Sequence, residues 1–218
     1  MPVPAKGDPV SDNTTRAAGA DAAGGGGPKR VRADVRRNLD ALLTAAGEVF
    51  ATSGVDAPVR QITARAGVGA GTLYRHFPQR ADLIAAVFRH EVDACADAAD
   101  SLAAQYGPAE ALSRWLQRFT AFIATKRGLS AALHSGDPAY DTLPAYFDQR
   151  FMPVLGALID AAVRAGEIRS DVDPEDLLTA TRNLTLPAQE DDSGHTRRMV
   201  ALLVDGLRYG AKGGPAAG

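Results

Sequence analysis

The stretch that decides the fold is VRQITARAGVGAGTLYRHFPQR, at residues 59–80. Its first part, 59–66, carries apolar residues at helical spacing and stops at Gly67. A second short helix is predicted from Ala70 to about Phe77, closed by Pro78. Two short helices joined by a glycine-bearing turn form a helix-turn-helix.

The two faces of this pair differ in chemistry. The residues expected to lock the helices together are apolar: Ile62, Ala66, Val68, Leu73 and Phe77. The residues left outward on the second helix are Ala70, Gly71, Thr72, Tyr74, Arg75 and His76. A small amino end allows a helix to enter a DNA major groove closely, while hydroxyl, guanidinium and imidazole groups reach phosphates and base edges.

Around this motif the period of apolar residues is helical throughout, and no alternating strand pattern is present. A first helix is predicted from Asp34 to Ser53, and the later ones cover about 82–102, 112–123, 151–162, 174–184 and 199–207. The fold class is therefore all-α. An amino-terminal three-helix helix-turn-helix domain (31–80) precedes a larger helical bundle (81–211). Residues 1–30 and 212–218, rich in glycine and alanine, are expected to be disordered tails.

Composition limits the function classes. Hydrophobic residues make up 45% of the chain, yet no apolar run approaches the ~18 residues of a membrane span, and no secretory signal is visible. A single cysteine, Cys95, excludes an internal disulfide, and its alanine-rich context favours a small buried side chain. We therefore expect a cytoplasmic protein without membrane association.

Charge is unevenly distributed along the chain. Residues 29–89 hold ten Lys and Arg against five acids, a net charge of +5, whereas the whole chain carries −2. The remainder therefore carries −7, and the basic block suggests that one end meets a polyanion.

The run Thr72-Leu-Tyr-Arg-His-Phe-Pro78, followed by Arg80 and Asp82-Leu83, resembles the DNA-binding domain of the tetracycline-repressor (TetR) family. The resemblance is specific over about residues 36–90, and residues 165–177 are similar to the approach to the dimer-forming helices of many members. It implies that Arg60 and Thr72 address bases or nearby phosphates, and that Tyr74, His76 and Arg80 hold the DNA backbone. Ala70 stands where many members carry a polar or charged residue. The full set of expected DNA contacts is Arg36, Arg60, Gln61, Ala70, Gly71, Thr72, Tyr74, Arg75, His76 and Arg80.

The resemblance also implies that 31–80 is a DNA-binding domain and that 81–211 is a ligand-binding and dimerisation domain. The protein is then expected to be a homodimer that binds double-stranded DNA and responds to a small apolar or aromatic ligand. The aromatic side chains of the second domain are either plain core or the lining of a ligand pocket. The pocket candidates are Trp115, Phe119, Phe122, Tyr146, Phe151 and Leu155, with Tyr140, Phe147 and Met152 as further possibilities. The expected dimer interface comprises Leu177, Leu178, Leu184, Met199, Leu202, Leu203 and Leu207.

Other chemistry finds no support in the sequence. The glycines at 67, 69 and 71 follow a helix rather than a strand, so they do not form a dinucleotide loop. The turn from His134 to Asp137 favours a solvated loop or a helix cap over a metal site. No catalytic residue, metal site or cofactor is expected. Two rival functions stay open: an all-helical enzyme or carrier with an incidental basic end, and an architectural DNA-binding protein without an effector.

Overall fold

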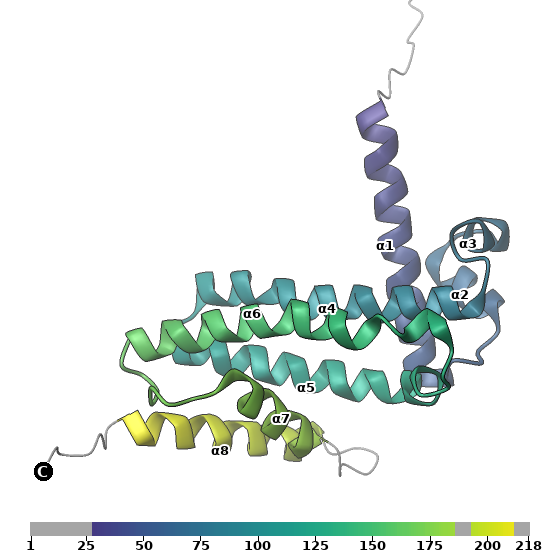
Figure 1. The fold of residues 1–218 in the computed structure, drawn as a ribbon. Helices are drawn as coiled ribbons and strands as arrows, with labels where there is room; N and C mark the ends of the chain where they lie inside the picture. The colour runs from purple at the N-terminus through teal and green to yellow at the C-terminus, as the bar shows by residue number, and fades with distance from the viewer. Residues whose placement is uncertain (1–27, 186–192, 212–218) are drawn as a thin grey trace, which may run out of the picture.

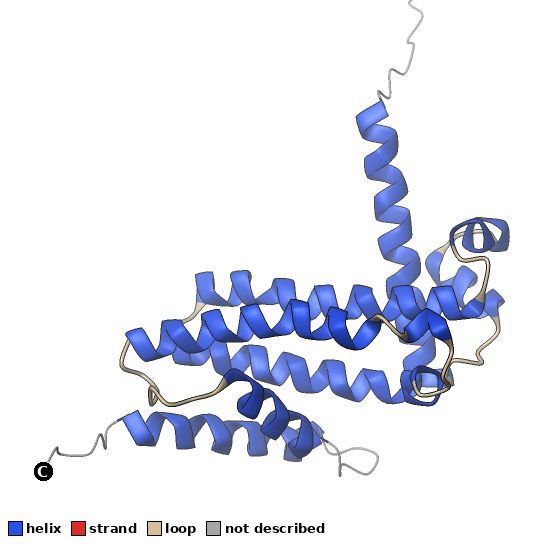
Figure 2. Ribbon diagram, viewed as in Figure 1, coloured by secondary structure: helices blue, strands red, loops and turns tan. Residues whose placement is uncertain are grey.

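The computed structural model describes residues 28–185 and 193–211, and within these ranges the secondary structure consists of helices joined by loops, without strands (Figures 1 and 2). The predicted all-α class is confirmed. The elements are α1 (Pro28–Ser53), α2 (Val59–Ala66), α3 (Ala70–His76), α4 (Arg80–Gln105), α5 (Pro108–Leu133), the 3-10 helix η1 (Pro138–Tyr140), α6 (Leu143–Arg164), α7 (Pro174–Thr185) and α8 (Ser193–Ala211).

The helix-turn-helix forms where the sequence predicts it. Gly67 adopts φ 67°, a left-handed conformation that a β-carbon resists, and it ends α2. The amide of Val68 then donates to the carbonyl of Thr63 at 3.0 Å, so the chain turns back over the end of α2. The α3 helix ends at His76, one residue before the predicted end, and Pro78 follows.

Side-chain caps fix two other helix starts. The Asp173 carboxylate accepts from the amides of Glu175 and Asp176 at 2.8 and 3.1 Å, which confirms the start predicted for α7. At α4, the side chains of Gln79 and Asp82 cap each other's backbone amides. This capping box starts α4 at Arg80, two residues before the predicted start.

Several helices are longer than the sequence predicts. The largest difference is α6, which begins at Leu143 rather than near Phe151 and contains Pro153 in its interior. Its first two turns carry exposed polar residues such as Asp148 and Gln149, so the apolar period is weak there. Residues 28–30, expected in the tail, are helical; the rest of the predicted tails, 1–27 and 212–218, lies outside the described residues.

The central helix is α5, which packs against α1, α4, α6, α7 and α8. Figure 1 shows α7 and α8 on the side of α5 away from α4, with the amino-terminal part of α1 projecting beyond the body. Trp115 on α5 is fully buried; its ring stacks on Phe119 with centroids 5.8 Å apart, and its indole N–H donates to the carbonyl of Cys95 at 3.1 Å. Buried residues of both predicted domains belong to one cluster, so the boundary at 80/81 stays a prediction.

None of the described helices combines the length and apolar character needed to cross a bilayer.

Cys95 is buried on α4, as the sequence suggests, and burial raises the pKa of its thiol from 9.0 to about 12. Below pH 9 the thiol is neutral in the folded and the unfolded chain alike. Between pH 9 and 12 only the unfolded chain ionises, so the free energy of unfolding falls as pH rises, by about 1.4 kcal/mol at pH 10. Urea unfolding of the wild type and of Cys95→Ala at pH 8 and pH 10 measures this. The loss on going to pH 10 is expected to be larger in the wild type; an equal loss would contradict the assignment.

Candidate nucleic-acid interface and ligand pocket

Helix α3 presents an exposed face. Leu73 is its buried residue, at 2% exposure, and belongs to the hydrophobic core, while α2 is the helix that α3 chiefly contacts. Ala70, Gly71, Arg75 and His76 are exposed, Tyr74 is 54% exposed, and Thr72 is half-buried. The residues predicted to face DNA therefore lie together on the accessible side of α3, at the periphery of the molecule (Figure 1).

Packing within the chain does not require glycine at the amino end of α3. A β-carbon built at Gly69 or Gly71 meets no atom within 4 Å, and neither residue has a positive φ. The folded chain therefore leaves room for a side chain at both positions. The small size of Gly71 matters only to something that approaches α3 from outside, as a DNA groove would.

Helix α2 supports α3 and adds polar groups. Arg60 and Gln61 are exposed on its first turn, and Arg36 is exposed on α1. Arg65 at the end of α2 pairs with Glu48 of α1, which joins the two helices at the surface. Contacts of Arg36, Arg60 and Gln61 with DNA stay predictions.

Arg80 has a structural role within the single chain. Its Nε donates to the carbonyl of Val55 at 2.5 Å and its Nη2 donates to that of Ala57 at 2.6 Å. The guanidinium also lies 5.8 Å from the ring centroid of Phe50. Arg80 thus fastens the α1–α2 loop to the start of α4, and its contact with the DNA backbone stays a prediction.

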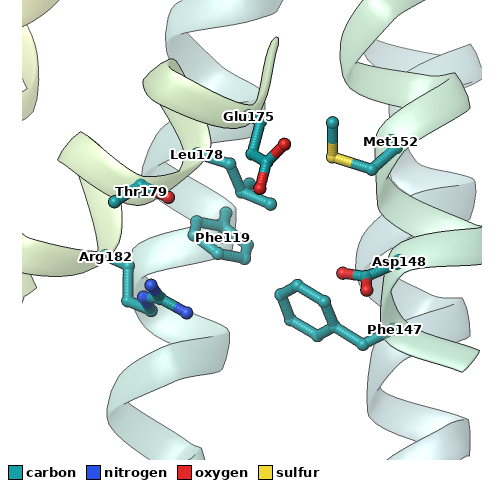
Figure 3. A pocket seen from close by; sticks show the side chains of 8 residues that line it. All are labelled: Phe119, Phe147, Asp148, Met152, Glu175, Leu178, Thr179 and Arg182. Carbon is teal, nitrogen blue, oxygen red and sulfur yellow. The ribbon is translucent and has the colours of Figure 1, made fainter. Parts of the chain in front are cut away.

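A pocket of about 330 Å³ opens between α5, α6 and α7 (Figure 3). We call it the carboxylate pocket. Its lining residues are Phe119, Phe147, Asp148, Met152, Glu175, Leu178, Thr179 and Arg182. A second cavity of about 400 Å³, the apolar pocket, shares Phe147, Asp148 and Arg182 with the first. It is also lined by Phe88, Ile123, Leu133, His134, Tyr140, Leu143 and Pro144.

Of the six side chains predicted to line a pocket, Phe119 borders the carboxylate pocket, although it has no exposed surface and belongs to the core as well. Trp115, Phe151 and Leu155 have no exposed surface and Phe122 is 5% exposed; these four are core and line neither pocket. They form the interior because the rings of α5 and α6 interlock, with Phe147 and Phe151 centroids only 4.6 Å apart.

Tyr146, the sixth candidate, lies outside both pockets. Its hydroxyl donates to the carboxylate of Asp93 on α4 at 2.7 Å. Arg150, one turn further along α6, donates to Asp93 and to Asp97, each at 2.6 Å. We call these four residues the α4–α6 polar network. Burial and the Asp93 hydrogen bond raise the pKa of Tyr146, so its phenol stays protonated and donates.

The charged lining of the carboxylate pocket was missed by sequence reasoning, which expected few charges there. A signal for it exists: Glu175, Leu178, Thr179 and Arg182 recur at the i, i+3, i+4, i+7 spacing of one helix face. From the sequence, only Leu178 of this face is assigned a role, and that role is in the dimer interface.

The predicted dimer residues fall into two groups. Leu177 and Leu178 are buried within the chain, at 4% and 7% exposure, because α7 packs them toward the bundle. Leu184, Met199, Leu203 and Leu207 are half-buried, and Leu202 is 62% exposed. Leu202, Gly206 and Tyr209, the last 85% exposed, continue one face of α8. The exposed apolar surface thus belongs to α8 rather than to the start of α7.

The turn from His134 to Asp137 contains a cap. The Asp137 carboxylate accepts from the amide of Ala139 at 2.9 Å and starts η1. The capping interpretation of this turn is confirmed for Asp137.

Comparison with known proteins agrees with this geometry. Residues 42–87 match the family model for bacterial regulatory proteins of the tetR family, and residues 107–209 match the model for the SbtR-like transcriptional regulator C-terminal domain. No curated protein matches the chain in sequence.

Two solved structures are similar over most of the chain. A TetR transcriptional regulator from Streptomyces coelicolor is 39% identical with a TM-score of 0.70, covering 82% of this chain and 99% of that one. A TetR transcription regulatory protein from Mycobacterium vanbaalenii is 36% identical with a TM-score of 0.65, at the same coverage of 82% and 99%. With the helix-turn-helix and the helical second domain in place, this chain belongs to the TetR family of bacterial transcriptional regulators.

Proposed function

We propose that this regulator occupies a roughly palindromic operator as a homodimer in the cytoplasm, represses transcription there, and leaves the DNA when a small molecule binds between α5, α6 and α7. The observation that supports this best is the free face of α3, where Gly71 and Tyr74 are exposed and no packing demand accounts for the small amino end. A dimer places two such helices in successive major grooves.

The proposed route from ligand to DNA runs through the α4–α6 polar network. Phe147 and Asp148 line the pockets on α6, and their neighbours Tyr146 and Arg150 bind Asp93 on α4. Helix α4 begins at Arg80, which holds the α1–α2 loop of the DNA-binding domain. A ligand that favours another position of α6 therefore shifts α4 and the spacing of the two α3 helices. It does so only to the extent that it binds the two arrangements with different affinity.

The test of DNA binding is Gly71→Leu. The folded chain has room for the new side chain, and replacing a helical glycine removes a cost of about 0.5–1 kcal/mol, so the thermal stability is expected to hold or rise. In a major groove the same side chain obstructs close approach of α3, and we expect operator affinity to fall by about tenfold or more.

Fluorescence anisotropy with operator DNA and thermal unfolding are measured on the same preparation. The matched control is Ala157→Leu, at an exposed position on α6 away from α3, which is expected to leave DNA affinity unchanged. A stable Gly71→Leu protein with wild-type operator affinity would contradict the placement of α3 against DNA.

A further inference from the structure

The carboxylate pocket has an uneven charge distribution. Asp148 of α6 and Glu175 of α7 lie on different walls, and Figure 3 shows both carboxylates directed into the space beside the Phe119 and Phe147 rings. Arg182, two turns beyond Glu175 on α7, is the one cationic side chain among the residues that line it. The lining therefore carries one net negative charge.

Among the described residues, the fold does not pair these charges with other side chains. Within the part of the chain that the structure describes, no hydrogen bond or ion pair engages the side chains of Asp148, Glu175 or Arg182. Glu175 sits in the first turn of α7, where a carboxylate stabilises the helix end. Asp148 lies in the second turn of α6 and faces aromatic rings, which leaves it without a comparable structural role.

The apolar part of the site continues beyond the carboxylates. Phe147 borders both the carboxylate pocket and the apolar pocket, where Phe88, Ile123 and Leu133 supply a wall without charge. Aromatic rings beside carboxylates attract a cation twice, through the ring faces and through the negative charge. A purely anionic ligand would be repelled by two carboxylates and attracted by one guanidinium, so its net interaction with these charges is unfavourable.

We propose that the effector is an amphiphilic organic cation. Its ammonium group lies between Asp148 and Glu175, beside the half-buried ring of Phe147, and its aromatic or aliphatic body extends along Phe88 into the apolar pocket. This assignment rests on the proposed ligand response of the regulator and specifies the chemical class of the ligand.

The experiment uses three probes with the same phenylbutyl body and different head groups: 4-phenylbutylammonium, 4-phenylbutanol and 5-phenylpentanoate. Trp115 is the single tryptophan of the chain and stacks on Phe119 at 5.8 Å, so its fluorescence reports on the pocket wall without any DNA present. We expect a saturable change with the ammonium probe and an affinity at least about tenfold lower for the carboxylate probe.

Substitutions of the two carboxylates test whether their charges determine the affinity for the ammonium probe. Asp148→Asn and Glu175→Gln are each expected to lower the affinity for the ammonium probe by about threefold to tenfold. The affinity for the alcohol probe is expected to stay unchanged. Asp160→Asn, which alters an exposed carboxylate of α6 outside both pockets, is the matched control and is expected to change neither.

The assignment is overturned if the ammonium probe gives no saturable response, if the carboxylate probe binds more tightly, or if Asp148→Asn behaves like Asp160→Asn. Its failure is distinct from failure of the proposed function. A cation that binds with the expected charge dependence but leaves operator affinity unchanged supports the ligand class and counts against ligand release. If only the anionic or the neutral probe releases DNA, the result supports ligand release and counts against a cationic effector.

Discussion

Leu202→Arg is expected to convert the protein to monomers and to lower operator affinity by about 100-fold or more. In a two-fold interface each substitution occurs twice and opposite its own copy, so it introduces unpaired, mutually repelling charges into an apolar contact. Leu202 is 62% exposed in the single chain, and the fold of each subunit is therefore expected to survive. Each monomer then binds its half-site independently, and the affinity gained when two linked subunits bind one operator together is lost.

Sedimentation velocity gives the association state, and operator binding is measured at the same protein concentration. Ala103→Arg, an equal change of charge on the exposed face of α4, is the control and is expected to stay dimeric. A Leu202→Arg protein that sediments as a dimer and binds operator normally would remove α8 from the proposed interface.

Among the proposed substitutions, Phe151→Ala is expected to lower the free energy of unfolding most, by about 3–5 kcal/mol. Phe151 has no exposed surface, and its ring centroid lies 5.7, 5.4, 5.5 and 4.6 Å from those of Trp115, Phe119, Phe122 and Phe147. Truncation leaves a cavity that four interlocked rings cannot fill by small movements.

The matched substitution is Phe147→Ala, one turn earlier on α6. Phe147 is half-buried and already borders both pockets, so its removal enlarges existing space and is expected to cost only about 1–2 kcal/mol. Urea unfolding at one protein concentration compares the two. A larger loss for Phe147→Ala would show that the division between core and pocket is misplaced.

The helix-turn-helix was predictable because its boundaries depend on local chemistry. Gly67 is required by a positive φ, Pro78 ends the third helix, and Asp173 caps α7 with its own carboxylate. Such signals act within a few residues and are readable in sequence. The start of α6 could not be predicted in this way. The first turns of this helix carry exposed polar residues, and packing on α4 and α5 stabilises it.

The site residues were harder to predict, because an apolar face looks the same whether it meets its own bundle or a second subunit. Leu178 and Leu202 are both leucines at helical spacing, yet one is 7% and the other 62% exposed. Arg80 shows the same limit for charge, because its hydrogen bonds to the carbonyls of Val55 and Ala57 could not be read from the sequence. Only the three-dimensional placement separates these cases.

The central claim, sequence-specific binding by a dimer, is tested most directly by selecting fragments from a random pool of double-stranded DNA with the purified full chain and sequencing them. The account predicts enrichment of inverted repeats whose half-site centres lie about one helical turn, ~10 base pairs, or a multiple of it apart. Gly71→Leu protein is expected to enrich nothing. Sequences retained by the wild type without any common motif, or a single asymmetric site bound by one subunit, would contradict the account.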